Sequence, residues 1–286
     1  MTLKWHDAPN SVLMYIILFV VLFISTSVGL EWPAYRSMIP EIPDEQVRGA
    51  IESTAVETLA EGDVHAPPVD AFQLAERLGM VVARDVVGAS TRARFARLGG
   101  FTAHNQAAIL LADDPRPERR QWAVAHEIGE SLAELVFDKL GVDPREAPHA
   151  ARENVANRLA GHLLLPSDWF VQDGLAVDWD LLELKRRYAT AIYELVARRM
   201  LEMPVGVVIT LADQGQIQWR LSNRFLRTPP LTAAERCAWQ AAFTHGESAR
   251  CEPGDLPDGI EDVRAWPIHE PEWRREIIRT VLADEW

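Results

Sequence analysis

His126-Glu127-Ile128-Gly129-Glu130 is the stretch of sequence from which the fold can be worked out. It lies within a long amphipathic segment that is expected to be a helix. On a helix, His126 and Glu130 are one turn apart and share a face, while Glu127 lies about 100° round the axis from His126. The stretch therefore predicts two metal-binding side chains on one helical face, with a second carboxylate beside them.

The spacing resembles the zinc motif His-Glu-x-x-His, in which both histidines bind the ion and the glutamate polarises the attacking water. Here Glu130 stands at the second histidine position, and a carboxylate can also bind zinc. An ordinary helix with a solvated acidic face is the alternative interpretation. The metal site is favoured because His126 and Glu130 lie next to the apolar stripe of Trp122 and Gly129, where a buried charge requires a partner or a metal.

A second helix is expected from His149 to about Leu165, ended by Pro166, and it offers candidates for a third ligand. His149 and Glu153 are one turn apart on one face. His162 is nine residues beyond Glu153 and about 180° away, so it is expected to be a surface or packing histidine. Small residues share the face of Glu153 and allow a close approach to the first helix: Ala156, Asn157 and Ala160. A plain helix contact with a solvated Glu153 is the alternative.

Together, the two segments resemble the ImmA/IrrE family of metallo-endopeptidases. The helix pair of that family has the sequence His-Glu-hydrophobic-Gly-His, followed by Glu-x-x-Ala-Asn-x-Phe-Ala-x-x-Leu-Leu-Met-Pro. The counterparts here are residues 126–130 and 153–166, and the Ala-Asn and Leu-Leu-Pro spacings are in register with Glu153. Supporting segments occur in the family's order: Pro67-Pro68-Val69-Asp70, the strand pair from Gly99 to Ala112, and Glu118-Arg-Arg-Gln121. The resemblance covers about residues 66–200.

The resemblance implies an α+β fold with a zincin-like helical core and a small β-sheet. It implies His126, Glu130 and Glu153 as metal ligands and Glu127 as the general base that activates water. Zn²⁺ is the expected metal, and two carboxylates with one imidazole also admit Mn²⁺ or Fe²⁺. His149 could supply a second nitrogen ligand. His104 is a candidate for contact with the substrate or the oxyanion, or a polar turn residue.

The resemblance also implies a protein or peptide substrate, such as a transcriptional repressor cut after stress. A catalytically silent relative that serves as a regulatory or binding module is the alternative, because Glu130 departs from the family's histidine. A membrane-tethered interaction protein is a further alternative. Residues 180–203 could be a DNA-binding helix pair, but their apolar residues fit packing on the core better. Nucleic acid is not expected as a partner, because 29 basic against 42 acidic residues give a net charge of -13.

Length and composition are those of an ordinary globular protein, with 286 residues of which 48% are hydrophobic. The two cysteines, Cys237 and Cys251, form no Cys-x-x-Cys pair, so neither a disulfide framework nor a thiolate zinc site is expected. They could form one bridge, although two separate thiols are the favoured interpretation.

The N-terminal segment is uncharged between Asp7 and Glu31 and continuously apolar from Val12 to Ile24. It predicts a hydrophobic helix and a single-pass membrane protein with residues 12–30 as the anchor. A cytoplasmic protein whose translation starts at Met38, or a signal peptide, are the alternatives.

Four parts are expected along the chain: the hydrophobic segment 1–37, a lead-in helix and linker 38–65, the metallopeptidase domain 66–203, and a C-terminal α+β extension 204–286. The long helix that carries His126 is expected to begin at Asp114-Pro115. In the extension, a hairpin is expected around residues 213–216 and a capping box at Thr232. A strand is expected from Val263 to Ile268, and a final helix from Glu272 to Leu282.

Overall fold

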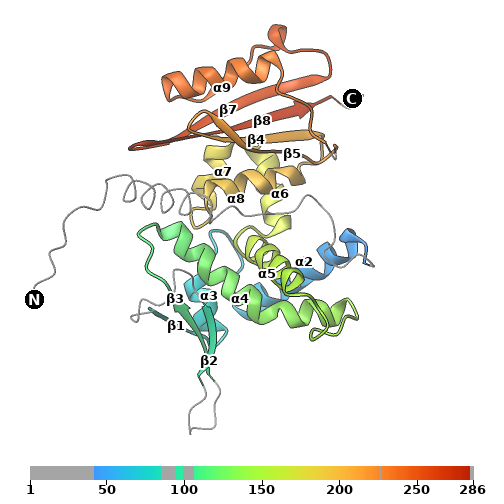
Figure 1. The fold of residues 1–286 in the computed structure, drawn as a ribbon, viewed down its shortest axis with the longest axis vertical. Coiled ribbons are helices and arrows are strands. Elements are labelled where there is room, and N and C mark those ends of the chain that lie inside the picture. The colour runs from blue at the N-terminus through green and yellow to red at the C-terminus, as the bar shows by residue number, and fades with distance from the viewer. Residues whose placement is uncertain (1–41, 85–93, 99–105, 226, 284–286) are drawn as a thin grey trace, which may run out of the picture. The chain divides into compact units, whose positions relative to one another are not determined.

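The computed structural model describes residues 42–84, 94–98, 106–225 and 227–283 (Figure 1). Over this part the protein is a mixed α+β structure with eight α-helices and two β-sheets, as the sequence predicts. All of it belongs to one compact unit, residues 36–286. The predicted N-terminal hydrophobic helix lies outside the described residues.

The first part of the described chain contains a small sheet that contacts helices α3 and α4. Helices α2 and α3 come first, and three strands follow in the order β1-β3-β2, with β1 parallel and β2 antiparallel to β3. The bounds are α2 Asp44–Glu61, α3 Ala71–Arg77, β1 Val81–Arg84, β2 Arg94–Leu98 and β3 Gln106–Leu111. The predicted strand at 99–103 lies outside the described residues, and β2 was not predicted.

The helical layer continues with α4, which carries His126. It begins at Pro117 with Arg116 as N-cap, two residues later than predicted. The side chain of Asp114 accepts a hydrogen bond from the backbone N–H of Arg116 (2.9 Å), so it forms a turn before the helix instead of capping it. The bounds are α4 Pro117–Lys139, α5 His149–Leu164, α6 Ser167–Ala176, α7 Leu181–Arg187, α8 Tyr193–Arg199 and the short 3₁₀ helix η1 Met200–Glu202. Helix α6 was not predicted.

Helices α4 and α5 lie side by side in close contact (Figure 1). A Cβ added at Gly129 would lie 2.6 Å from the carbonyl oxygen of Ala156, which is nearer than real Cβ atoms come to backbone. Gly129 and Ala156 are both buried at this contact. Glycine is therefore required at position 129 because the backbone of α5 occupies the space of a side chain.

The C-terminal part is a five-stranded antiparallel sheet in the order β5-β4-β8-β7-β6. Helix α9 begins with the predicted capping box of Thr232 and Glu235 and packs on one face of the sheet. The bounds are β4 Val207–Asp213, β5 Gln216–Ser222, α9 Ala233–His245, β6 Ala249–Arg250, η2 Pro253–Asp255, β7 Ile260–Glu270 and β8 Trp273–Leu282. The predicted hairpin and the strand at 263–268 are confirmed.

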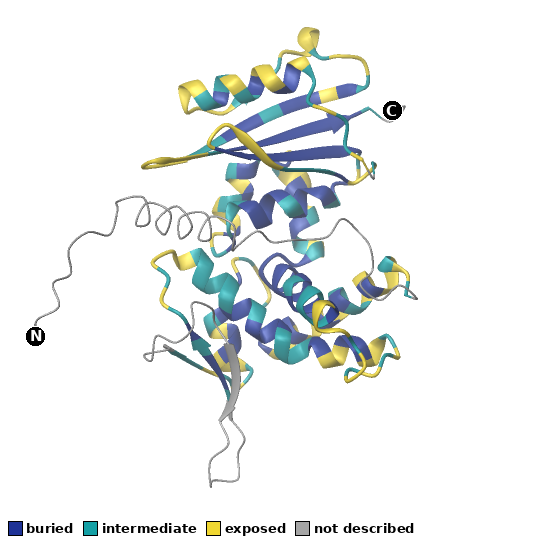
Figure 2. Cartoon of the chain, in the orientation of Figure 1, coloured by how far each residue is buried: buried dark blue, intermediate teal, exposed yellow. Residues whose placement is uncertain are grey.

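The prediction of a final helix from Glu272 to Leu282 is wrong, because this segment is the strand β8. It pairs with β4 on one side and β7 on the other, and every residue from Glu276 to Leu282 is buried (Figure 2). A central strand that is covered on both faces lacks the polar and apolar alternation that marks a half-exposed strand. The charged residues in the segment therefore had the appearance of an exposed helical face.

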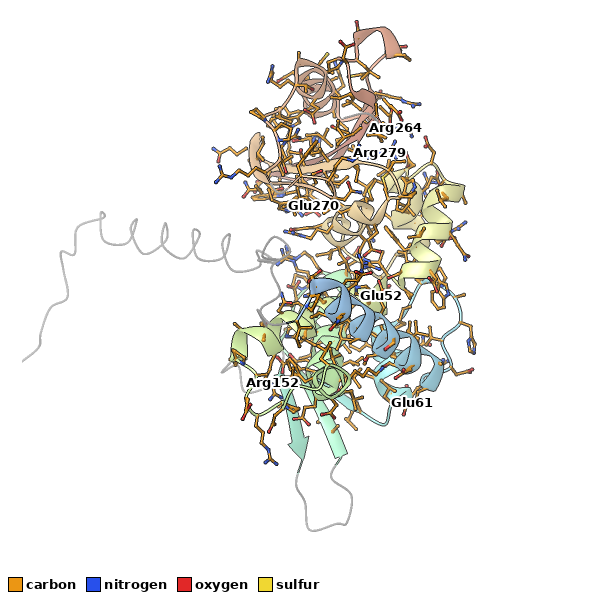
Figure 3. All side chains as sticks on the ribbon, turned by 90° about the vertical axis from the view of Figure 1, so that its right-hand side faces the viewer. Glu52, Glu61, Arg152, Arg264, Glu270 and Arg279 are labelled. Atoms are coloured by element: carbon orange, nitrogen blue, oxygen red, sulfur yellow. The ribbon has the colours of Figure 1, made fainter. Side chains whose placement is uncertain are left out.

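Two of those charged residues, Glu276 and Arg279, are buried with partners. The guanidinium of Arg279 is 1% exposed and donates to Asp262 at 2.5 Å and to the carbonyl of Asp178 at 2.7 Å. Arg264 lies beside Arg279 (Figure 3) and also pairs with Asp178. Each buried charge thus has an opposite charge or a carbonyl to offset its lost hydration.

The sheet has two apolar faces that enter different cores. The face toward α9 contributes to a small core that includes Val208, Ile278 and Ala238. The opposite face contributes Ile209 and Ile277 to the same large core that holds the helical layer. The C-terminal sheet and the helices therefore share one continuous apolar interior.

A buried polar cluster joins α2, α5, α6 and α8. His162, which the sequence leaves as a surface or packing residue, is 4% exposed and packs inside this cluster. Its Nε2 accepts a hydrogen bond from Arg199 at 3.2 Å, and its Nδ1 lies 3.2 Å from the hydroxyl of Ser167. Burial, and then the positive charges of Arg199, Arg158 and Arg48, lower the pKa of His162 well below its usual range. His162 is therefore neutral in the folded protein at neutral pH.

The prediction of a single-pass membrane protein is corrected. Among the described residues, none of the helices is both long and apolar enough to cross a membrane. The described helices of at least 18 residues, α2 and α4, have many charged side chains along their length. Residues 12–30, the predicted anchor, lie outside the described part of the chain.

Gly129→Ala should destabilise the protein by roughly 1–3 kcal/mol, because the backbone of α5 has to move away from the new methyl group. The matched control is Gly49→Ala in α2, where a Cβ meets nothing within 4 Å. At this exposed helical position alanine should stabilise by up to about 1 kcal/mol. Urea unfolding followed by circular dichroism checks both, and equal effects of the two substitutions would contradict the close contact.

His162 should make the folded state less stable as the pH falls below about 6.5, the ordinary pKa of histidine. The unfolded chain then binds a proton that the folded chain does not, which costs up to about 1.4 kcal/mol per pH unit. Glu202, whose pKa burial raises, acts in the opposite direction. Urea unfolding at pH 7.5, 6.5 and 5.5 should show a smaller loss of stability for His162→Gln than for the wild type. Equal pH dependence of the two proteins would refute the assignment.

Candidate metal centre

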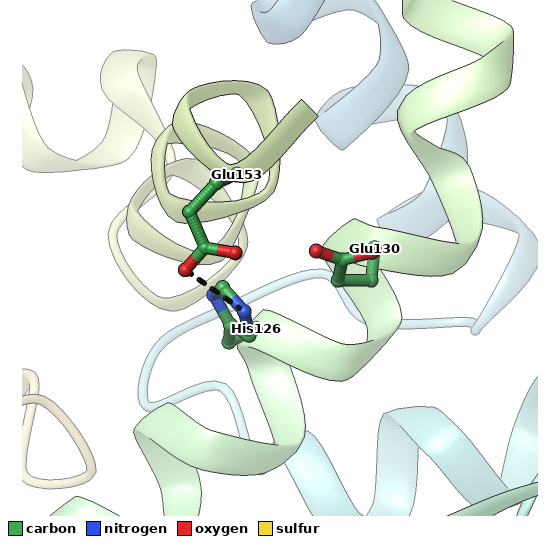
Figure 4. Close-up of side chains that lie close together, drawn as sticks. All are labelled: His126, Glu130 and Glu153. Carbon is green, nitrogen blue, oxygen red and sulfur yellow. Dashed lines mark ion pairs between the residues drawn. The ribbon is translucent and has the colours of Figure 1, made fainter. Parts of the chain in front are cut away.

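Three side chains from α4 and α5 converge on one point. Ligand atoms of His126, Glu130 and Glu153 all lie within 4.8 Å of one another (Figure 4). His126 and Glu130 project from neighbouring turns of α4, and Glu153 projects from α5 toward them (Figure 4). In the described part of the chain, this is the group of His, Cys, Asp and Glu residues whose spacing could hold a metal ion. The sequence predicted the same three residues.

The site is partly open to solvent. The side chain of His126 is 17% exposed and that of Glu153 is 44% exposed, and the nitrogen Nε2 of His126 lies 3.7 Å from Oε1 of Glu153. Tetrahedral zinc with ligand distances of about 2.0–2.2 Å would separate its ligand atoms by about 3.4 Å. Side-chain rotations that shift these atoms by about 1 Å would therefore bring the three into range of one ion.

Asn157 orients the imidazole of His126. Its Oδ1 lies 3.0 Å from Nδ1 of His126, on the next turn of α5 after Glu153. An amide oxygen can only accept, so this contact puts the proton on Nδ1 and leaves the lone pair of Nε2 directed toward Glu153. The neutral tautomer with a free Nε2 is the form that binds a metal. The residues present therefore fit a divalent ion.

The sequence analysis did not predict that Asn157 orients His126. It treated Asn157 as one of the small residues at the contact between the two helices. The position of Asn157 in the sequence indicated this role, because Asn157 lies one turn beyond Glu153 on the helical face that meets α4. Histidine ligands usually donate their second ring N–H to an oxygen, so a polar residue at that position could have been assigned to His126.

Glu127 is 5% exposed and follows His126 on α4. It is buried more deeply than the three clustered side chains. Its carboxylate therefore lies in a part of α4 from which bulk water is largely excluded.

Of the other candidate residues, the structure describes His149 and His162, and neither joins the cluster. His149 is the first residue of α5 and is exposed, and it is absent from the group of converging side chains. His104 lies outside the described residues. His162 belongs to the buried polar cluster that also contains Arg199.

The helix pair α7 and α8 packs on the core. No residue of α8 is exposed, and Leu195 and Val196 are fully buried. The basic residues of this pair contact groups within the protein: Lys185 lies 3.4 Å from Glu118, and the guanidinium of Arg198 lies 4.4 Å from the ring centroid of Trp219. Helix α8 therefore has no free face that could enter a DNA groove.

A family model supports this assignment of the site. The IrrE N-terminal-like domain, a peptidase family, matches residues 75–201, which include α4, α5 and all three clustered side chains. The domain at residues 75–201 is therefore of the ImmA/IrrE type. The family consists of metal-dependent peptidases, which indicates chemistry of the metallopeptidase type for the domain.

A solved structure shares the fold of this chain. A Mycobacterium tuberculosis transcriptional regulator aligns with a TM-score of 0.56 over 84% of this chain and 81% of that chain, with 19% sequence identity. At this identity the similarity concerns the fold alone. No curated protein matches the sequence.

Asn157→Leu should weaken metal binding by roughly 10- to 100-fold, because His126 loses the acceptor that fixes its tautomer and its orientation. Asn157→Asp keeps an oxygen acceptor at the same place and should retain most of the affinity. Competition against a chromogenic zinc chelator measures both variants. Equal affinities for Asn157→Leu and the wild type would show that the contact with His126 does not support metal binding.

Proposed function

We propose that this protein is a metal-dependent endopeptidase that hydrolyses a peptide bond in a protein substrate. The observation that carries the proposal is the convergence of His126, Glu130 and Glu153 on two helices of a peptidase-family domain. The domain is proposed to span residues 66–203, with residues 204–286 as a C-terminal extension.

His126, Glu130 and Glu153 are the residues that would hold the ion. Zn²⁺ is the proposed metal, and the two carboxylates also admit Mn²⁺ or Fe²⁺. A bound divalent ion supplies Lewis acidity, which polarises water and the scissile carbonyl. Asn157 keeps the Nε2 lone pair of His126 available, and the close contact at Gly129 keeps α4 and α5 near enough for both helices to contribute ligands.

Glu127 is proposed as the general base. Its carboxylate would accept a proton from the attacking water and then deliver that proton to the amine that leaves. The burial of Glu127 supports this role, since a carboxylate shielded from bulk water exchanges protons with the substrate in preference to solvent.

The proposed substrate is a protein segment such as part of a transcriptional repressor. The shared fold with a protein described as a transcriptional regulator supports a place in gene regulation. Cleavage of a repressor would allow transcription of the genes that it represses. This protein would not need to contact DNA for that role.

A catalytically silent relative is the second candidate function. The observation that favours it is Glu130, which replaces one neutral imidazole by a carboxylate and makes the ligand set more anionic. A more anionic set leaves less positive charge on the ion to activate water. In that case the domain would act as a regulatory or protein-binding module.

Glu127→Gln should lower the rate of peptide cleavage by roughly 10²- to 10⁴-fold while the metal stays bound, because the base is lost and the three ligands remain. The measurement uses the full chain, one equivalent of Zn²⁺ or Mn²⁺, and a peptide library from a bacterial proteome, with new peptide ends detected by mass spectrometry. Metal content is determined by elemental mass spectrometry in parallel.

Glu153→Ala is the control, and it should lose both the metal and the activity. Glu130→His restores the family's ligand and should keep the metal. A folded wild type that binds no metal would refute the endopeptidase. A wild type that binds metal but cleaves nothing, while Glu130→His cleaves, would establish the silent relative.

A further inference from the structure

The two cysteines of the chain lie on neighbouring elements of the C-terminal part. Cys237 is on the exposed side of α9, and Cys251 follows the edge strand β6 and is partly buried. Cys251 packs against the small core that contains Ala234 and Ala238 of α9. Residue 251 is therefore held against the same two turns of helix that carry Cys237.

A hydrogen bond fixes the position of the Cys251 sulfur. Its Sγ donates to the carbonyl oxygen of Ala234 at 3.1 Å, and Ala234 precedes Cys237 by three residues on α9. A helical side chain can bend back to the carbonyl three residues earlier, as Ser131 does in α4 when it donates to Ile128 at 2.7 Å. The side chain of Cys237 can reach the carbonyl that Cys251 already contacts.

The two cysteine side chains therefore lie beside the same carbonyl group of α9. A disulfide requires Cβ atoms about 3.5–4.5 Å apart and sulfurs that rotation about χ1 can bring together. On a helix the Cβ of a residue lies close to the carbonyl three residues earlier, so the Cβ of Cys237 lies near the oxygen that the Cys251 sulfur contacts. The electrostatics are consistent with the proximity, since burial and then the neighbouring Cys237 raise the pKa of the Cys251 thiol.

We propose that Cys237 and Cys251 form a reversible redox site, which a low-molecular-weight disulfide such as glutathione disulfide oxidises to an intramolecular disulfide. The exposed thiolate of Cys237 attacks the oxidant, forms a mixed disulfide and releases one glutathione. The sulfur of Cys251 then loses its proton and attacks the sulfur of Cys237, which releases the second glutathione. Two protein thiols are oxidised, and one glutathione disulfide is reduced to two glutathione molecules.

The disulfide would stabilise the edge of the sheet at β6. Strand β6 has two residues and, among the described strands, pairs with β7 alone. The bridge would join the segment after β6 directly to α9, closing a short loop between residues 237 and 251. This redox site is separate from the proposed metal centre and does not depend on the proposed peptidase activity.

The test oxidises the reduced full chain with defined ratios of glutathione and glutathione disulfide. The wild type should lose both thiols and a mass of two hydrogens, and a protease digest should contain one peptide pair linked through Cys237 and Cys251. Its thermal midpoint should rise by roughly 5–10 °C on oxidation. Dithiothreitol should reverse all three changes.

Two single variants are the matched controls. Cys251→Ser should stop at the mixed disulfide on Cys237, and Cys237→Ser should react more slowly because its remaining thiol is partly buried. The linked fraction at a fixed glutathione ratio should be independent of protein concentration. The equilibrium constant for disulfide formation, calculated from this fraction, should be at least about tenfold larger for the folded chain than for the chain unfolded in urea.

Persistent mixed disulfide in the wild type, linkage between two chains, or equal equilibrium constants in buffer and urea would each overturn the proposal. These outcomes would mean that the folded structure does not bring the two sulfurs together.

Discussion

The close contact between α4 and α5 is the constraint on which the rest of the structure depends. Gly129 has no side chain, so the carbonyl of Ala156 can lie where a Cβ would otherwise be. This short separation lets Glu153 reach His126 across the gap, and lets Asn157 accept a hydrogen bond from the same imidazole. One glycine thus determines the distance between the helices, the ligand cluster and the tautomer of its histidine.

The sequence was most informative where chemistry and helical geometry coincide. The convergence of His126, Glu130 and Glu153 could be predicted because residues one turn apart share a face, and because the pattern around Glu153 was in register with a known family. The capping box at Thr232 could also be predicted from the sequence, because it depends on two residues three positions apart. Local periodicity was sufficient for these features.

Features that depend on distant neighbours could not be read in the same way. The charged residues of β8 have the pattern of an exposed helical face. Only the structure shows that Arg279 is buried and donates to Asp262 and to the carbonyl of Asp178 before α7. His162 could be placed opposite Glu153 on α5, but its neutral state depends on Arg199 and on burial between four helices. The apolar stretch at residues 12–30 suggested an anchor from composition alone, and the described helices do not support a membrane-spanning protein.

The shared interior of the helices and the C-terminal sheet has a consequence for how this chain can evolve. Ile209 and Ile277 on the sheet belong to the same core as Leu195 and Val196 on α8. The family match ends at residue 201, but the apolar core continues beyond this residue into the sheet. A gene fusion that exchanged the sheet for another module would uncover an apolar surface on the helices. The helices and the sheet therefore depend on one another for the burial of their apolar side chains.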